Sequence, residues 1–249
     1  MSKGHPPSLY KTIFQVRYES QLRYVQQISP AAQQMTEYPD WETDGVRVTL
    51  RDRDKHCSVA IAPDSFSYEQ DSGDASLEKE RIQRLLDVIP SSMGVDSATR
   101  IGYRQWFMLA VDMPLDSLVS VLNVKLLSSD EGLRQVLPQT ISDLMYRVDA
   151  SDDGHKYHIT VGPVQKNEIP RWLPFNRGHH LRPGTAGGEF RKIVDAYPDV
   201  AVLMDIDMYR EAEVLPMTEA SSFVDQCRGT LSQMADSLGR YLFAVDLGG

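Results

Sequence analysis

Two carboxylates near the end of the chain, Asp205 and Asp207, are the residues whose spacing first suggests chemistry. They are two positions apart in the apolar run 196–209, which predicts a strand, so they share one face of it. Carboxylate oxygens are the ligands that Mg²⁺ prefers, and aspartates on one strand face can hold it in nucleotidyl-transferring enzymes. The alternative is a half-exposed strand whose aspartates form salt bridges, with Arg210 or Lys192 as partners. We favour the salt bridge over the metal site.

A second candidate is the segment 177–188, in which basic and histidine side chains precede a glycine-rich turn. Its ionisable residues are Arg177, His179, His180 and Arg182. Glycine lets backbone N–H groups approach an anion closely, and arginine binds phosphate or carboxylate through two hydrogen bonds. The segment lacks the Gly-Lys-Ser/Thr step of a P-loop. Three interpretations stay open: a mobile surface loop, which we favour, a partner-binding loop, and a small-anion or nucleotide site.

The step Trp172-Leu173-Pro174-Phe175 places apolar side chains inside an otherwise polar stretch. An exposed apolar run of this kind is typical of a recognition segment. The alternative, which we favour, is that it folds back onto the sheet. Trp172 and Phe175 are therefore candidates for contact with a partner, together with the basic residues that follow them.

No catalytic set can be assembled from the other residues. The two cysteines, Cys57 and Cys227, are far apart and form no CxxC step, which indicates small buried side chains in a reducing compartment. The chain has no GxSxG nucleophile motif. A metal site that combines the adjacent histidines with His155 or His158 lacks a nearby cysteine or aspartate at ligand spacing. We therefore expect no catalytic residue, no metal and no cofactor.

Composition limits the class of protein further. The chain has 249 residues, with 26 basic and 35 acidic side chains and a net charge of −9. This charge opposes attraction to nucleic acid. No apolar stretch approaches the roughly 18 residues of a membrane span, and the first residues lack the apolar core of a signal peptide. These features predict a cytoplasmic protein that binds neither membrane nor nucleic acid.

The elements that must position these residues are organised around the stretch 98–127. Alternation from Arg100 to Val111 places Ile101 and Tyr103 on one face of a strand and Trp106 on the other, so both faces are apolar and the strand is central. Pro114 suits the start of a helix. The apolar stripe of that helix should pack on the strand.

The same patterns predict the remaining elements. We expect strands from Lys11, at 46–61 as a hairpin, at 66–68, at 144–161 as a second hairpin, and at 196–209. Helices are expected from Ser29-Pro30 to Tyr38, at 76–89 with Pro90 as its end, and at 218–243. The fold class is then α+β with two mixed or antiparallel sheets and packed helices, the first half resembling a split βαβ (ferredoxin-like) order. The domains are a flexible arm (1–10), an N-terminal domain (11–128) and a C-terminal domain (129–249) that contains a long loop, 162–189.

Several short motifs resemble a known family. They are Asp64-Ser65-Phe66, the step 100–104 (RIGYR), the strand 203–207 (LMDID), and Phe243 after a last long helix. Together they resemble a sporadically distributed bacterial family of uncharacterised proteins about 250 residues long. The resemblance implies a defence- or mobile-element-associated gene. It implies no activity, cofactor or catalytic residue.

The sequence therefore favours a non-catalytic protein that binds other proteins or itself, as a subunit of a bacterial defence or mobile-element assembly. The first alternative is a sensor or enzyme that takes a nucleotide or other anion at 177–188, with Asp205 and Asp207 as cation ligands. A nucleic-acid binder ranks last.

Overall fold

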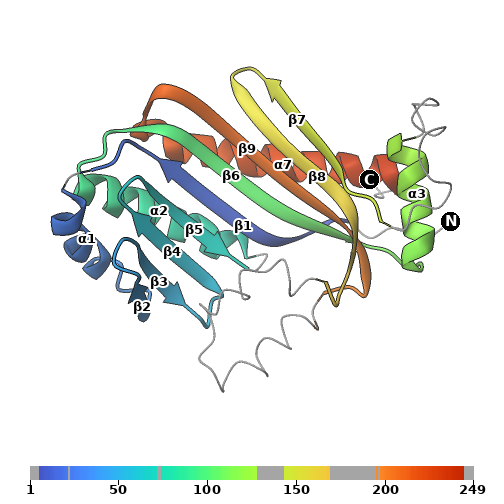
Figure 1. Cartoon of the computed structure of the whole chain (residues 1–249), viewed down its shortest axis with the longest axis horizontal. Coiled ribbons are helices and arrows are strands. Elements are labelled where there is room, and N and C mark those ends of the chain that lie inside the picture. The colour runs from blue at the N-terminus through green and yellow to red at the C-terminus, as the bar shows by residue number, and fades with distance from the viewer. Residues whose placement is uncertain are drawn as a thin grey trace.

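The computed structural model describes residues 6–21, 23–71, 74–127, 143–168, 195 and 197–243. Its described strands form one antiparallel sheet in the order β2-β3-β4-β5-β1-β6-β9-β8-β7 (Figure 1). The strands are β1 Ser8–Arg17, β2 Asp40–Thr43, β3 Val48–Asp52, β4 Cys57–Ala62, β5 Ser65–Gln70, β6 Ser97–Ala110, β7 Tyr146–Asp152, β8 His155–Gln165 and β9 Val200–Pro216. The long strands β6 and β9 pair near the middle of the sheet.

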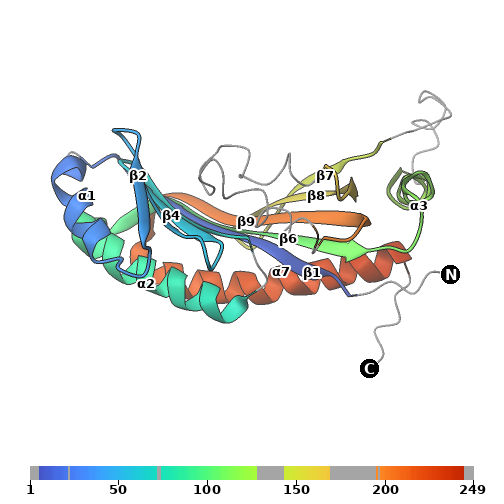
Figure 2. The same cartoon turned by 90° about the horizontal axis from the view of Figure 1, so that it is seen from below.

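One face of the sheet is covered by helices (Figure 2). The covering helices are α1 Tyr24–Gln33, α2 Ala75–Met93 and α7 Ala220–Phe243, and the 3₁₀ turn η2, Met217–Glu219, leads into α7. A further helix, α3 Leu115–Leu127, lies at one end of the strands. We call the side of the sheet that no described helix covers the open face.

The apolar core lies between the sheet and these helices. In β6 the residues that face the helices are Ile101, Tyr103, Phe107 and Leu109, and all four are buried. Trp106 and Met108 point the other way and join a smaller apolar cluster on the open face. The alternation predicted for this strand is confirmed, and so is its central position, because β6 pairs with β1 on one side and β9 on the other.

The expectation of two sheets is wrong. β6, from the first half of the chain, pairs with β9, from the second half, from Ser97 opposite Pro216 to Ala110 opposite Ala201. Every described pairing is antiparallel, and the strands from both halves of the chain belong to one sheet in place of the two expected. Alternation reveals that a strand has two buried faces, but it does not reveal which strand lies beside it. The expected domain boundary near residue 128 lies outside the described residues.

Most of the predicted elements are present, but several ends differ. β1 begins at Ser8, inside the expected flexible arm. α1 begins at Tyr24, so Pro30 lies inside the helix and Ser29 is not its N-cap. The Tyr24 hydroxyl donates a 2.8 Å hydrogen bond to the Ile61 carbonyl, which fixes this earlier start against the sheet. α2 likewise continues through Pro90 and ends at Met93, and Gly94 caps it with a φ of +69°, which suits glycine.

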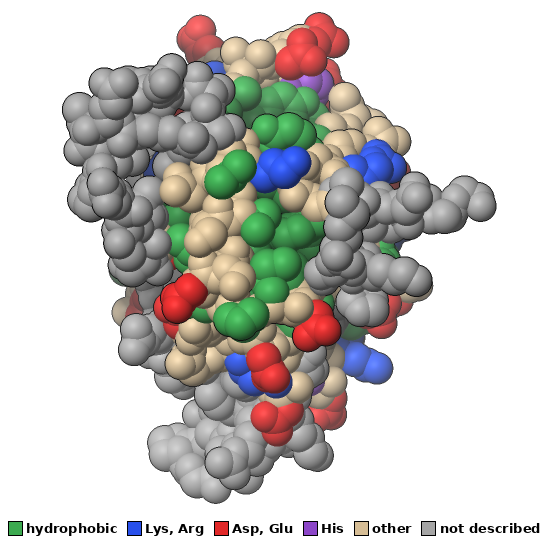
Figure 3. Space-filling model, turned by 90° about the vertical axis from the view of Figure 1, so that its right-hand side faces the viewer, with side chains coloured by type: hydrophobic (Ala, Val, Ile, Leu, Met, Phe, Trp, Pro, Cys, Tyr) green, Lys and Arg blue, Asp and Glu red, His purple; other side chains and the backbone are tan. Residues whose placement is uncertain are grey.

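The helix predicted after β6 is confirmed, but its packing was predicted wrongly. α3 packs against β8 and α7 at the end of the sheet and does not lie along β6. Seen from this end, hydrophobic side chains run down the middle of the surface (Figure 3). On α3, Val124 is 55 % exposed. Within the described ranges, no helix has the length and apolar character needed to cross a membrane.

Candidate functional site

Asp205 and Asp207 lie on the open face of β9, as their spacing predicted. The side chain of Asp205 accepts a 2.6 Å hydrogen bond from Nε of Arg104 and a second bond from its Nη2. Asp207 accepts a 3.0 Å bond from Nη2 of Arg100. Both carboxylates are therefore engaged in salt bridges. Their partners are arginines of the neighbouring strand β6. Arg210 instead pairs with Glu219, and Lys192 lies outside the described residues.

These pairs continue along the open face as a ladder of charges. Arg100 also lies 3.6 Å from Glu211, and Lys156 of β8 pairs with Glu211 at 2.9 Å. The ring of Tyr209 lies 4.3 Å from the Arg100 guanidinium carbon and 6.0 Å from Nζ of Lys156. Three cations, Arg100, Arg104 and Lys156, thus face three carboxylates, and the ladder is neutral.

Some groups of the ladder have shifted pKa values, and each of its charged side chains is paired with one of opposite charge. Burial raises the pKa of Asp207, against the opposing effect of Arg100 and then Arg104. The hydrogen bond to Asp205 raises the pKa of Arg104, which keeps the guanidinium charged. Among the described residues, no group of three His, Cys, Asp or Glu side chains is arranged to hold a metal ion. The geometry therefore fits a structural ladder.

The other predicted site residues lie outside the described part of the chain. Trp172, Phe175, Arg177, His179, His180 and Arg182 all belong to 169–194, which the structure does not describe. The histidines weighed with them do not come together: His155 stacks on Phe223 on the helix side, whereas His158 lies opposite Asp207 on the open face. Both cysteines are buried, as expected, and burial raises the pKa of Cys57 to about 12.

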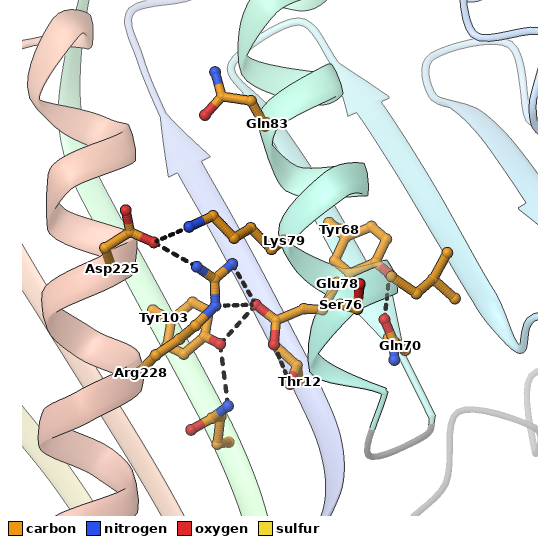
Figure 4. A network of polar contacts seen from close by, with 12 residues as sticks. Thr12, Tyr68, Gln70, Ser76, Glu78, Lys79, Gln83, Tyr103, Asp225 and Arg228 are labelled. Atoms are coloured by element: carbon orange, nitrogen blue, oxygen red, sulfur yellow. Dashed lines mark hydrogen bonds and ion pairs between the residues drawn. The ribbon is translucent and has the colours of Figure 1, made fainter.

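A polar network that sequence analysis missed lies beneath the helices (Figure 4). Its centre is Glu78, in the first turn of α2, whose side chain is 1 % exposed. Glu78 accepts hydrogen bonds from the Tyr103 hydroxyl at 2.7 Å and from Arg228 Nε at 2.9 Å. Gln105 donates a 3.0 Å bond to the Tyr103 oxygen. The network joins β6, α2 and α7.

The groups of this buried network are likewise poorly suited to catalysis. Burial and the neighbouring Glu78 carboxylate raise the pKa of Tyr103, so its hydroxyl stays protonated. Arg228 neutralises Glu78 and in turn pairs with Asp225 at 2.6 Å. The partners come from segments up to 150 positions apart, so no local motif could have revealed them. Asp74, which caps α2 by accepting bonds from the Ser76 and Leu77 N–H groups, sets the first turn that presents Glu78.

A different kind of site lies at the opposite end of the sheet from α3. A groove of about 370 Å³ separates α1 from the hairpin of β2 and β3. Its apolar lining comes from Ile28, Ala32, Met35, Trp41, Val48 and Leu50. Trp41 is 69 % exposed, which is unusual for so large an apolar side chain. Val25 on α1 and Val46 in the β2–β3 turn are exposed as well.

The residues on either side of Trp41 in β2 are acidic, point to the opposite face of the strand and are paired with arginines. Glu42 pairs with Arg51, and Asp40 pairs with Arg53 at 2.6 Å. The Glu42 side chain is 43 % exposed while that of Arg51 is 3 % exposed, so the carboxylate forms the solvent side of that pair. The hairpin predicted at 46–61 corresponds to β3 and β4, whereas β2 was not predicted, and the groove was therefore not identified from the sequence.

Comparison with known proteins identifies no family for the chain. No protein-family model matches the chain, and no curated protein matches it significantly.

Proposed function

We propose that the chain is a non-catalytic protein that works by binding a partner protein. The observation that carries this proposal is the groove between α1 and the β2–β3 hairpin, with Trp41 exposed at its border. Burying a tryptophan contributes more to association than burying most other side chains, and exposed aromatic residues beside apolar pockets are typical binding hot spots. The proposed role is that of an assembly subunit.

The polar sites support the same proposal because their carboxylates are already paired. Asp205, Asp207 and Glu78 are each engaged by an arginine, which leaves them poorly placed to bind a cation or transfer a proton. The alternative function, an anion-binding enzyme or sensor that uses Asp205 and Asp207 as cation ligands, would first have to break these ion pairs. No observation on the described residues favours it.

The test is site-specific cross-linking in the native cells. A photoreactive amino acid at position 41 should cross-link one protein, and the same probe at Val214, a residue of β9 that is 64 % exposed, should not. Purification without cross-linking should recover that protein in a stoichiometric complex, and Trp41→Ala should abolish the recovery. An uncross-linked monomer under gentle purification would overturn the proposal.

A further inference from the structure

A lysine is buried on the open face, where the end of β5 lies beside β1. Lys11 is 2 % exposed, and its Nζ lies 5.3 Å from the centre of the Trp106 ring. The ammonium group donates a 2.7 Å hydrogen bond to Oδ1 of Asp71 and another hydrogen bond to Glu69. A buried charge requires a partner of opposite sign. Lys11 has two such partners, and we call Lys11, Glu69 and Asp71 the β1–β5 triad.

The register of the two strands brings the triad together. The last pair of β1 and β5 is Thr12 opposite Gln70. Lys11 and Asp71 each lie one residue beyond this pair, so they face one another across the strands. Side chains two positions apart along a strand share a face, which places Glu69 on the same side as Asp71.

The triad has a surplus of one negative charge, because one ammonium group faces two carboxyl groups. The Asp71 side chain is 4 % exposed, whereas that of Glu69 is 27 % exposed. A buried charge without a partner of its own is costly, and two carboxyl groups that share a site avoid this cost when one of them takes up a proton. Glu69 can keep its charge beside water, so the proton is expected on Asp71.

The surroundings of Asp71 act in the same direction. Burial raises the pKa of Asp71 against the opposing effect of Lys11, while Glu69 raises it further and His56 lowers it. The backbone N–H of Asp71 donates a 2.9 Å hydrogen bond to the His56 carbonyl, which holds Asp71 at the end of the strand. Asp71 therefore stays beside Lys11 and Glu69 instead of turning into water.

Three further ionisable groups lie near the triad. Arg104 of β6 interacts with the charge of Glu69, but its guanidinium is bound to Asp205 by two hydrogen bonds. Burial raises the pKa of the Cys57 thiol and of the Tyr197 hydroxyl, so both groups stay neutral. Within the described part of the chain, the triad thus keeps its surplus of negative charge.

We propose that the β1–β5 triad is a pH-sensitive contact, in which Asp71 carries a proton in the folded protein and releases it to water as pH rises. While Asp71 is protonated, Lys11 balances Glu69. After the proton has left, a second negative charge is buried beside the same lysine, and the contact between β1 and the end of β5 weakens. The inference is independent of the proposed binding function.

The sign of the effect follows from proton linkage. The folded state binds the proton of Asp71 more tightly than the unfolded state does. The stability that this contributes is fully present below the ordinary aspartate pKa and is lost as pH rises through the folded-state pKa. Between these two values, Asp71 should increase the ratio of unfolded to folded molecules by up to about tenfold per pH unit.

The test compares the full-length wild type with Asp71→Asn by urea denaturation over the acid and neutral range of pH. Asparagine keeps an acceptor for Lys11 but cannot ionise. The stability of Asp71→Asn relative to the wild type should therefore increase as pH rises. The matched control is Asp87→Asn, which replaces an exposed carboxylate of α2 and should produce no such trend.

A second measurement follows the proton itself. NMR titration of the Asp71 carboxyl carbon in the wild type should give a pKa above the ordinary aspartate value. Glu69→Gln should lower this pKa because it removes the competing carboxylate, and Lys11→Met should raise it because it removes the ammonium group.

Two results would overturn the inference. The first is a variant Asp71→Asn that loses stability relative to the wild type as pH rises, since ionised Asp71 would then be one half of an ordinary stabilising ion pair. The second is an Asp71 pKa at or below the ordinary aspartate value. If Asp71→Asn does not fold, the titration of the wild type decides alone.

Discussion

Strand β6 contributes alternate residues to two arginine–carboxylate networks on opposite faces of the sheet. Towards the helices, Tyr103 joins the pair of Glu78 and Arg228, and towards the open face Arg104 pairs with Asp205. The chemical groups are the same, but the carboxylates of Glu78 and Asp205 are 1 % and 13 % exposed, and the side chains of Arg228 and Arg104 are 18 % and 41 % exposed. Water therefore screens the second pair more than the first. The comparison teaches that burial, rather than the presence of an ion pair, decides how strongly each network holds the fold.

The largest expected effect is that of Glu78→Ala. The substitution leaves the Arg228 guanidinium and the Tyr103 hydroxyl without their acceptor beneath the helices. We expect the free energy of unfolding to fall by about 3–5 kcal/mol, measured by urea denaturation. The matched control is Asp225→Ala, which removes the more exposed partner of Arg228 and should cost less than about 1 kcal/mol. Equal losses for the two variants would contradict the role given to burial.

On the open face, Arg104→Ala should have an intermediate effect. Asp205 would lose its two hydrogen bonds but remain close to water, so we expect a loss of about 1–2 kcal/mol. Raising the salt concentration should reduce the effect of Arg104→Ala and leave that of Glu78→Ala nearly unchanged. If both effects respond to salt alike, the two faces are not screened differently.

The pH dependence sharpens the comparison within the ladder itself. Burial raises the pKa of Asp207, whereas the hydrogen bond from Lys156 lowers the pKa of Glu211. The raised pKa of Asp207 means that folding disfavours its charge, so its contribution to stability decreases as pH rises from the ordinary aspartate value through the folded-state value. Glu211 contributes stability above the ordinary glutamate value and loses it as pH falls through its lowered pKa.

Titration of both carboxyl groups by NMR checks these directions. Lys156→Ala should return the pKa of Glu211 towards its ordinary range and leave that of Asp207 raised. If Lys156→Ala shifted the pKa values of both groups in parallel, Glu211 at the exposed end of the ladder would not be independent of Asp207 in its buried part.

The smallest expected effect on stability is that of Trp41→Ala, which provides a reference outside both networks. Trp41 is largely exposed. Its replacement by alanine should therefore change the free energy of unfolding by no more than about 0.5 kcal/mol. Val214→Ala is the matched control, and thermal denaturation is the measurement. A loss above about 2 kcal/mol would mean that Trp41 holds α1 against the sheet, and the groove would then be a packing gap.

Local patterns predicted individual elements well and their assembly poorly. Alternation identified both faces of β6, and the apolar stripe identified α7, because each pattern lies within one element. The pairing of β6 with β9 joins residues from 91 (Ala110 and Ala201) to 119 (Ser97 and Pro216) positions apart, which no local pattern records. The two helices with wrong ends contain Pro30 and Pro90, and tertiary packing outweighed the tendency of proline to mark a boundary.

The candidate sites divide in the same way. The shared face of Asp205 and Asp207 was predicted from strand geometry alone. The preference for a salt bridge over a metal site was predicted from the same geometry. Their arginine partners could not be predicted, since β6 and β9 were assigned to different sheets. The Glu78 network and the Trp41 groove were missed for a related reason, because each is assembled from three elements whose relative positions are set by packing.

The pairing of β6 with β9 also has a consequence for synthesis of the protein on the ribosome. β6 is complete at residue 110, but β9 begins only at residue 200. During that interval the nascent chain carries a strand of 14 residues that is apolar on both faces, with one edge unpaired. Exposed apolar edges of this length promote aggregation. Translation that stops between these two strands should therefore yield products that depend on chaperones or are degraded.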